Sequence, residues 1–320
     1  MSRPAPLKLP QPPGPIQTAG LPTSHLLLGL CVIAVWGSNF VVIKYALHVL
    51  PPLTLAALRF ALVVFPAIFF LPRPAASWRN LAAYGLFIGA GQFGLLFLAM
   101  KGSISPGLAS LVVQTQVFFT IALSMIRTGE RPQPTSFAAL ALAAAGLGLI
   151  VARSEADATP MGVALTLGAA ASWACGNTVS RAAGSVNMVA YVVWSSLFAA
   201  PALLALALAF EGPGAVLSGL ARADLPAWGA ILWQSLANSI FGYAAWGWLL
   251  SRHPAARITP LALLIPVVGL GASALLLGEG LPLWKLEAAA LVMAGLAANL
   301  LLPYASDALR SLRRTSDAPR

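Results

Sequence analysis

The stretches "VWGSNFVVIK" at residues 35–44 and "SWACGNTVSR" at residues 172–181 are two versions of one pattern. Each places a tryptophan, then an asparagine, then a basic residue inside an apolar run. Trp36 and Trp173 are separated by 137 positions, as are the basic residues that end the two stretches. This match indicates that the chain contains an internal duplication.

Two further matches follow in the same order along the chain. "RTGERP" and "LLGEGLP" both contain Gly-Glu, and their glutamates, Glu130 and Glu279, are separated by 149 positions. An "AGL" triplet follows each glutamate, with Gly146 and Gly295 again 149 positions apart. Three matches in one order predict two homologous units rather than chance similarity.

The composition is that of a membrane protein. The chain has 320 residues, of which 59% are hydrophobic and 9% are charged, whereas a soluble domain carries about 25% charged residues. Apolar runs long enough to cross about 30 Å of hydrocarbon as helices recur along almost its whole length. The net charge of +10 is spread thinly between these runs, which favours topology-setting loop charges over a nucleic-acid-binding surface. The sequence therefore predicts an all-α membrane protein.

Turn signals rich in proline and glycine divide the apolar runs into ten expected transmembrane helices. These are residues 25–47, 53–71, 78–100, 104–126, 134–152, 160–181, 187–210, 225–249, 256–278 and 283–302.

The basic residues predict the orientation of these helices. The nineteen Lys and Arg residues divide into thirteen in the tails, loops and helix ends on the side of the two termini, four on the other side, and two, Lys44 and Arg59, within expected helices. Both termini are therefore expected in the cytoplasm. Residues 1–24 are expected to be a disordered proline-rich tail, and residues 303–320 a basic tail.

The two units, residues 25–152 and 160–302, are each expected to contain five helices. Because five is an odd number, the second unit must enter the membrane from the opposite side. Inverted repeats of this kind are typical of secondary transporters, which work by alternating access around a central cavity.

The paired "W…N…K/R" and "GE…AGL" patterns resemble the EamA-type transporters of the drug/metabolite transporter superfamily. The resemblance covers residues 25–302 and includes "GQFGLLFLA", "GLASLVVQTQVFFTI" and "PLALLIPVVGL", which are similar to bacterial O-acetylserine and cysteine exporters. The resemblance implies ten helices in two inverted repeats in the bacterial inner membrane. It also implies export of small amino-acid metabolites such as cysteine or O-acetylserine without ATP hydrolysis.

Alternatives within the superfamily are an exporter of drugs or other metabolites, and a flippase for lipid carriers. An enzyme is disfavoured because the three histidines lie far apart at helix ends and no HExxH or GxSxG motif occurs. We expect no cofactor, and no metal, since Cys31 and Cys175 lack metal-ligand spacing. Glu287 is the only acid inside an expected helix, and the sequence leaves proton-driven and facilitated transport both open.

Polar side chains inside membrane helices usually face a bundle interior or a wet cavity. The alternative role is hydrogen bonding between helices without a ligand. The expected substrate-binding set consists of Trp36, Asn39, Gln92, Gln114, Gln116, Trp173, Asn177, Gln234, Asn238 and Tyr243.

Two cations and two acids have a separate interpretation. Lys44 and Arg59 are candidates for binding the carboxylate of an amino-acid-like substrate, the alternative being that their long stems snorkel to the membrane surface. Glu130 and Glu279 lie at helix ends and are expected to contact loop cations or backbone rather than substrate.

Overall fold

The computed structural model describes residues 21–128, 134–153, 157–253 and 255–316, with only the backbone described at 128, 134–136, 255–256 and 301–316. The expected proline-rich tail falls almost wholly outside these ranges, and so does Glu130. Within the described residues the secondary structure is helical, apart from one isolated antiparallel bridge between Ile104 and Ala158.

The first half of the chain forms a series of helices that ends at Arg153. They are α1 (Thr23–Ala46), α2 (Pro52–Val64), η1 (Ala67–Phe69), α3 (Trp78–Gly85), η2 (Leu86–Gly94), α4 (Leu95–Gly102), α5 (Pro106–Val112), η3 (Val113–Thr115), α6 (Gln116–Thr128) and α7 (Pro134–Arg153).

The second half repeats this order, with the ten-residue helix α10 at the place of the 3₁₀ turn η1. Its helices are α8 (Pro160–Ala182), α9 (Met188–Phe210), α10 (Pro213–Arg222), α11 (Leu225–Leu232), η4 (Trp233–Phe241), α12 (Gly242–Arg252), α13 (Ala255–Ile258), η5 (Thr259–Leu264), α14 (Ile265–Leu277) and α15 (Leu283–Ser316). Helix α15 continues past residue 302, where its membrane segment was expected to end.

Seven helical segments among the described residues are long and apolar enough to cross a membrane. They correspond to seven of the ten expected spans. The other three expected spans are also helical. The described side chains of α7 cover only Phe137–Arg153, and α8 and residues 225–252 contain many Trp, Asn, Gln, Ser and Gly residues. The count of ten crossings therefore stays a prediction.

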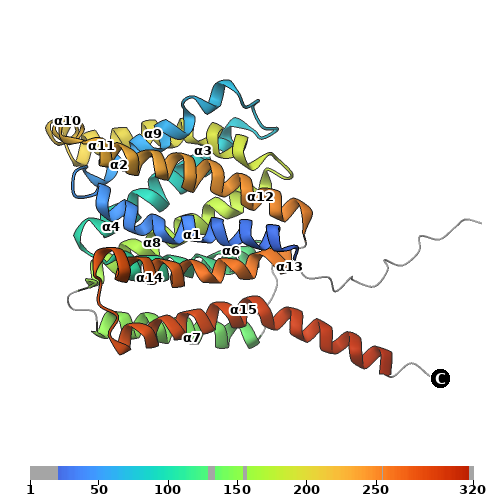
Figure 1. Ribbon diagram of the computed structural model, residues 1–320. Helices are drawn as coiled ribbons and strands as arrows, with labels where there is room; N and C mark the ends of the chain where they lie inside the picture. The colour runs from blue at the N-terminus through green and yellow to red at the C-terminus, as the bar shows by residue number, and fades with distance from the viewer. Residues whose placement is uncertain (1–20, 129–133, 154–156, 254, 317–320) are drawn as a thin grey trace, which may run out of the picture.

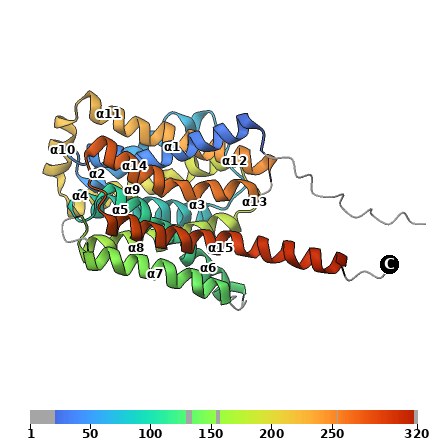
Figure 2. The same ribbon diagram turned by 60° about the horizontal axis from the view of Figure 1, so that its bottom comes forward.

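The long helices lie side by side in one bundle (Figures 1 and 2). The start of α1 and the end of α15 lie at the same end of this bundle. Helices α7 and α15 pack together along one flank, α2 packs on α9, α1 packs on α14, and α6 packs on α8.

Helix geometry departs from the α form at matched places in the two halves. The third long segment of each half contains a nine-residue π-helix, η2 and η4 respectively. The fourth segment of each half contains a 3₁₀ turn, η3 and η5. Such departures often occur at functional sites, and no sequence pattern predicted the π-helices.

The repeat-related glycines Gly146 and Gly295 hold α7 and α15 close together. A Cβ atom added at Gly146 would lie 2.7 Å from the Val292 side chain, and one added at Gly295 would lie 2.5 Å from the Ala139 carbonyl oxygen. Each glycine thus admits the backbone of the other helix. Gly85 and Gly89, spaced four apart on the third segment, make the same kind of contact with α9.

Replacing Gly146 with leucine should separate α7 from α15, because the new side chain overlaps Val292. Overpacking of this kind costs about 1–3 kcal/mol, so the melting temperature of the purified protein should fall by several degrees. Gly148→Leu is the matched control, since nothing lies within 4 Å of a Cβ at that position on the same helix. Equal melting temperatures for the two variants would contradict the close contact.

Candidate functional site

Two adjoining cavities lie at the centre of the bundle. The deep cavity has a volume of about 80 Å³, and the wide cavity has a volume of about 470 Å³. They share a wall made by Trp36, Gln114, Trp173, Tyr243 and Ile265. Because these residues come from both halves of the chain, the cavities lie between the two halves rather than within one.

Helix α1 contributes the expected stripe of side chains to the deep cavity. Trp36, Asn39 and Ile43 all line it. The indole nitrogen Nε1 of Trp36 donates to the backbone oxygen of Asn238 at 3.0 Å. Asn39 is 3% exposed, and its Oδ1 has no hydrogen-bond partner among the described residues. An amide oxygen without a partner beside a cavity is suited to accept from a ligand.

The repeat-related asparagine on α8 is held differently. Asn177 lines the wide cavity, where its Nδ2 donates to Gln116 Oε1 at 3.0 Å and to Thr120 Oγ1 at 3.4 Å. This amide therefore links two helices as well as facing the cavity. Trp173, one turn earlier, lines both cavities.

Some of the expected glutamines line the cavities, and another packs between helices. Gln92 lines the deep cavity with an unpartnered Oε1, and Gln114 lines both cavities. Gln234 lines neither of them, is fully buried, and donates from Nε2 to Ala230 O at 3.3 Å. Its Oε1 has no partner among the described residues, and a role for Gln234 in binding substrate stays a prediction. Asn238, four residues on, lines the deep cavity.

Neither candidate cation lines the central cavities. Lys44 donates to Met100 O at 3.3 Å and lines a separate pocket near Asp157 and Glu279. Arg59 is 1% exposed, so its stem does not carry the guanidinium to the membrane surface. Phe93 and Tyr243 line both the deep cavity and the small pocket that contains Arg59.

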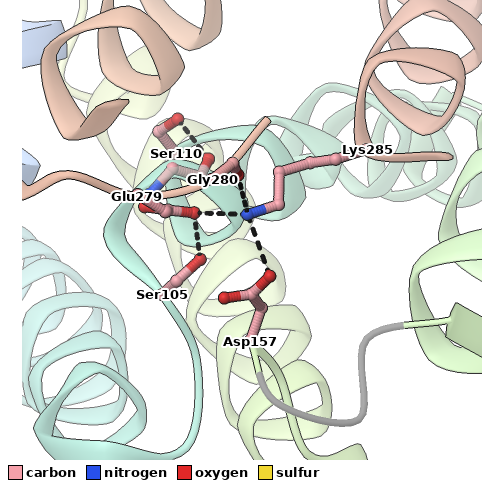
Figure 3. A network of polar contacts seen from close by, with 7 residues as sticks. Ser105, Ser110, Asp157, Glu279, Gly280 and Lys285 are labelled. Carbon is pink, nitrogen blue, oxygen red and sulfur yellow. Dashed lines mark hydrogen bonds and ion pairs between the residues drawn. The ribbon is translucent and has the colours of Figure 1, made fainter. Parts of the chain in front are cut away.

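A network of charges ties the loops together at one end of the bundle (Figure 3). The fully buried Lys285 places Nζ at 2.9 Å from Glu279 and at 3.0 Å from Asp157. Glu279 also accepts from the Ser105 hydroxyl at 2.5 Å and from the Gly107 backbone N–H at 3.1 Å. The expectation for Glu279 is confirmed, because its partners are a cation and backbone or loop donors.

The wide cavity extends toward the opposite end of the bundle. Its lining includes Gly247 and Leu250, near the end of α12, and Thr259, which follows α13. Figure 1 places the end of α12 and α13 together at the end opposite to α10. The wide cavity thus extends toward one end of the bundle, while the network around Lys285 links the loops at the other end.

The EamA-like transporter family matches this chain twice, at residues 23–152 and 160–301. The chain belongs to the EamA-like transporter family.

Curated relatives of this EamA-like protein cover most of its length. The probable amino-acid metabolite efflux pump of Salmonella typhimurium is 45% identical over 279 residues, covering 85% of this chain and 93% of its own. The protein of the same description in Escherichia coli K12 is 41% identical, with 86% and 94% covered. The uncharacterized inner membrane transporter YedA of E. coli K12 is 30% identical, with 82% and 83% covered.

A crystal structure of another protein shares the fold. It is 21% identical to this chain, with a TM-score of 0.59, and the similarity covers 88% of this chain and 97% of the other.

Sequence reasoning missed the role of Lys285. Lys285 lies in the first turn of α15 and is fully buried. Its position six residues after Glu279 was a usable signal, but Asp157 comes from a distant linker. Only the folded chain shows that both acids meet the same ammonium group.

Replacing Glu279 with glutamine should destabilise the protein, because Lys285 then keeps only the half-exposed Asp157 as a counter-charge. Breaking a buried ion pair costs about 3–5 kcal/mol, which should appear as a lower melting temperature. Glu287→Gln makes the same change on the exposed face of α15 and should be neutral. If the Glu279→Gln variant has the same melting temperature as the wild type, the ion pair with Lys285 does not stabilise the protein.

Proposed function

We propose that this protein is a secondary transporter that exports small, zwitterionic amino-acid metabolites, such as O-acetylserine or cysteine, across the bacterial inner membrane. The observation that carries the proposal is the chemistry of the deep cavity. Amides and indoles line it, and two of its amide oxygens, in Asn39 and Gln92, have no partner among the described residues. The descriptions of the two most similar relatives named above support the same substrate class.

The lining suits a solute that carries both charges but no net charge. None of the described residues that line the deep and wide cavities is charged. In the proposed complex, Asn39 and Gln92 accept from the α-ammonium group, and amide and indole N–H groups donate to the α-carboxylate. A substrate with an additional net charge would lose its hydration without a counter-charge in the cavity.

The described residues that line the deep and wide cavities include no carboxylate that could couple transport to protons. Glu287, the only acid in an expected membrane helix, is exposed on α15 and lines neither cavity. Proton exchange normally uses a titratable group on the substrate pathway. The proposal is therefore facilitated export down the substrate gradient.

The proposed architecture is ten membrane crossings in two inverted units, residues 25–152 and 160–302. The packing supports this symmetry, because each helix pair in contact has an equivalent pair made by the repeat-related helices. Helix α1 packs on α14 and on η4, while its repeat partner α8 packs on α6 and on η2. Helices α7 and α15, the last of each unit, pack on each other.

Alternating access assigns a role to the two ends of the bundle. The wide cavity lies toward the end where the basic residues predict the cytoplasm. The network of Lys285, Glu279 and Asp157 links the loops at the other end. We therefore interpret this conformation as inward-facing, and in the proposed cycle opening outward would require the loops around Lys285 to separate.

A second candidate is a larger aromatic solute such as a drug. The wide cavity has three tryptophans, Trp36, Trp173 and Trp246, in its lining. Indole faces bind aromatic and cationic solutes by stacking.

Single-cysteine labelling tests the orientation. In a background with Cys31 and Cys175 replaced by alanine, Arg222→Cys on α10 should react with a membrane-impermeant maleimide in cells with a permeabilised outer membrane. Ser251→Cys at the end of α12 should react only after the inner membrane is opened, because both sites are exposed but lie on opposite sides. Labelling of both sites under the same condition would show that residues 225–252 do not cross the membrane.

Counterflow into proteoliposomes tests the substrate. Liposomes loaded with unlabelled O-acetylserine should take up labelled O-acetylserine far faster than protein-free liposomes, and uptake should change little between two pH values. Lysine and aspartate should compete weakly because of their net charge, and aromatic amines should compete only if the second candidate is right. Uptake equal to that of empty liposomes for every zwitterionic amino acid would contradict the proposal.

A pair of variants identifies the cavity used in this assay. Asn39→Leu removes an unpartnered amide oxygen, and the loss of one hydrogen bond to a charged group should weaken apparent affinity about tenfold. Asn299→Leu is the matched control, since Asn299 lines a different, mostly apolar pocket against α6 and α7. If Asn39→Leu transports as the wild type does, the deep cavity is not the binding site.

A further inference from the structure

The guanidinium of Arg59 is buried without a charged partner. Its Nη2 donates to Ser239 Oγ at 2.8 Å and to Gln234 O at 3.4 Å. Its Nε and Nη1 have no hydrogen-bond partner, and no ion pair among the described residues involves it. Arginine stays protonated in proteins, so α2 carries an uncompensated positive charge inside the bundle.

Aromatic rings compensate only part of this charge. The Cζ atom of Arg59 lies 3.9 Å from the ring centroid of Phe93 and 5.2 Å from that of Phe60. Such contacts cover the faces of the guanidinium. They leave N–H groups at its edge, and an unpaired buried N–H of a charged group is unfavourable.

A small pocket, here called the Arg59 pocket, adjoins the guanidinium. Arg59 shares it with Tyr84, Ser195, Ser239 and Tyr243, and its volume is about 10 Å³. This is close to the smallest space that holds one water-sized particle. The pocket is too small for the carbon skeleton of an amino acid.

The polar groups of the Arg59 pocket that have no partner among the described residues can all donate a hydrogen bond. Ser195 is 1% exposed, and its hydroxyl is a second buried group without a partner. The unpartnered N–H groups of Arg59 add further donors, whereas the hydroxyls of Tyr84 and Tyr243 bond each other. None of the described residues that line the pocket is acidic. A set of donors around one cation matches a small anion and excludes a metal cation.

We propose that the Arg59 pocket binds a single monovalent anion of halide size, for which chloride is the abundant ligand. The anion accepts hydrogen bonds from the free edge of Arg59 and from Ser195, and it balances the buried charge. This site is distinct from the proposed substrate cavity, because Phe93 and Tyr243 stand between the two pockets. The inference does not depend on the identity of the exported solute.

The position of the site connects it to the two π-helices. Phe93 belongs to η2, and Ser239, which binds the guanidinium, belongs to η4. Ser235, also in η4, donates from its hydroxyl to the backbone oxygen of Arg59 at 2.9 Å. An anion in the Arg59 pocket would therefore stabilise the contact between segments from both halves of the chain.

The test measures melting of the purified protein at constant ionic strength while sodium gluconate is replaced by sodium chloride or bromide. Gluconate is too large for the Arg59 pocket, so chloride and bromide should raise the melting temperature by about 2–4 °C in a saturable manner. Arg59→Met should abolish this dependence on the anion, and Arg222→Met, which removes a charge from the exposed α10, should retain it.

A second variant keeps the test decisive if Arg59→Met does not fold. Ser195→Ala removes one donor and leaves the guanidinium in place, so the halide concentration for half-maximal stabilisation should rise about five- to tenfold. Equal melting in chloride and gluconate would overturn the proposal. So would stabilisation by zwitterionic amino acids but not by halides, because Arg59 would then serve a substrate carboxylate, and so would an unchanged halide response in both Arg59→Met and Ser195→Ala.

Discussion

Every polar group that enters the hydrocarbon must find a partner inside the protein or face water, and the rest of this structure depends on that constraint. Backbone groups satisfy it as helices, which accounts for the all-helical architecture of the described residues. The same constraint sorts the side chains. Asn177 is satisfied by Gln116, Lys285 is satisfied by two acids, and Asn39 keeps an oxygen that no described residue satisfies.

These unsatisfied groups have the most informative positions in the molecule. Asn39 and Gln92 border the deep cavity, and Arg59 and Ser195 border the Arg59 pocket. The first pair offers oxygens and the second offers donors, so the two sites are suited to ligands of opposite character. A buried polar group without a partner calls for an explanation, and the proposed ligands would supply the missing partners.

The repeat explains how one chain can build a cavity that belongs to neither half. Equivalent segments meet across the centre, and small residues let them approach closely, as Gly146 and Gly295 do between α7 and α15. The departures from α geometry occur at equivalent places as well, and η2 and η4 both supply cavity-lining residues, among them Gln92 and Asn238. In the proposed cycle, exchanging the conformations of the halves opens the opposite end.

The sequence by itself determined the helical membrane class, the family, the duplication and most of the polar side chains that line the cavities. Composition gives the class, and the spacing of Trp36 and Trp173 gives the duplication. The lining is predictable locally, because helix periodicity places residues three or four apart on one face. The tertiary structure decided that Gln234 packs away from the cavities, that Arg59 lies behind Phe93, and that Lys285 joins Glu279 to Asp157. Gln234 lies in the π-helix η4, and the other two features depend on contacts between segments far apart in the chain. Neither leaves a periodic signal in the sequence.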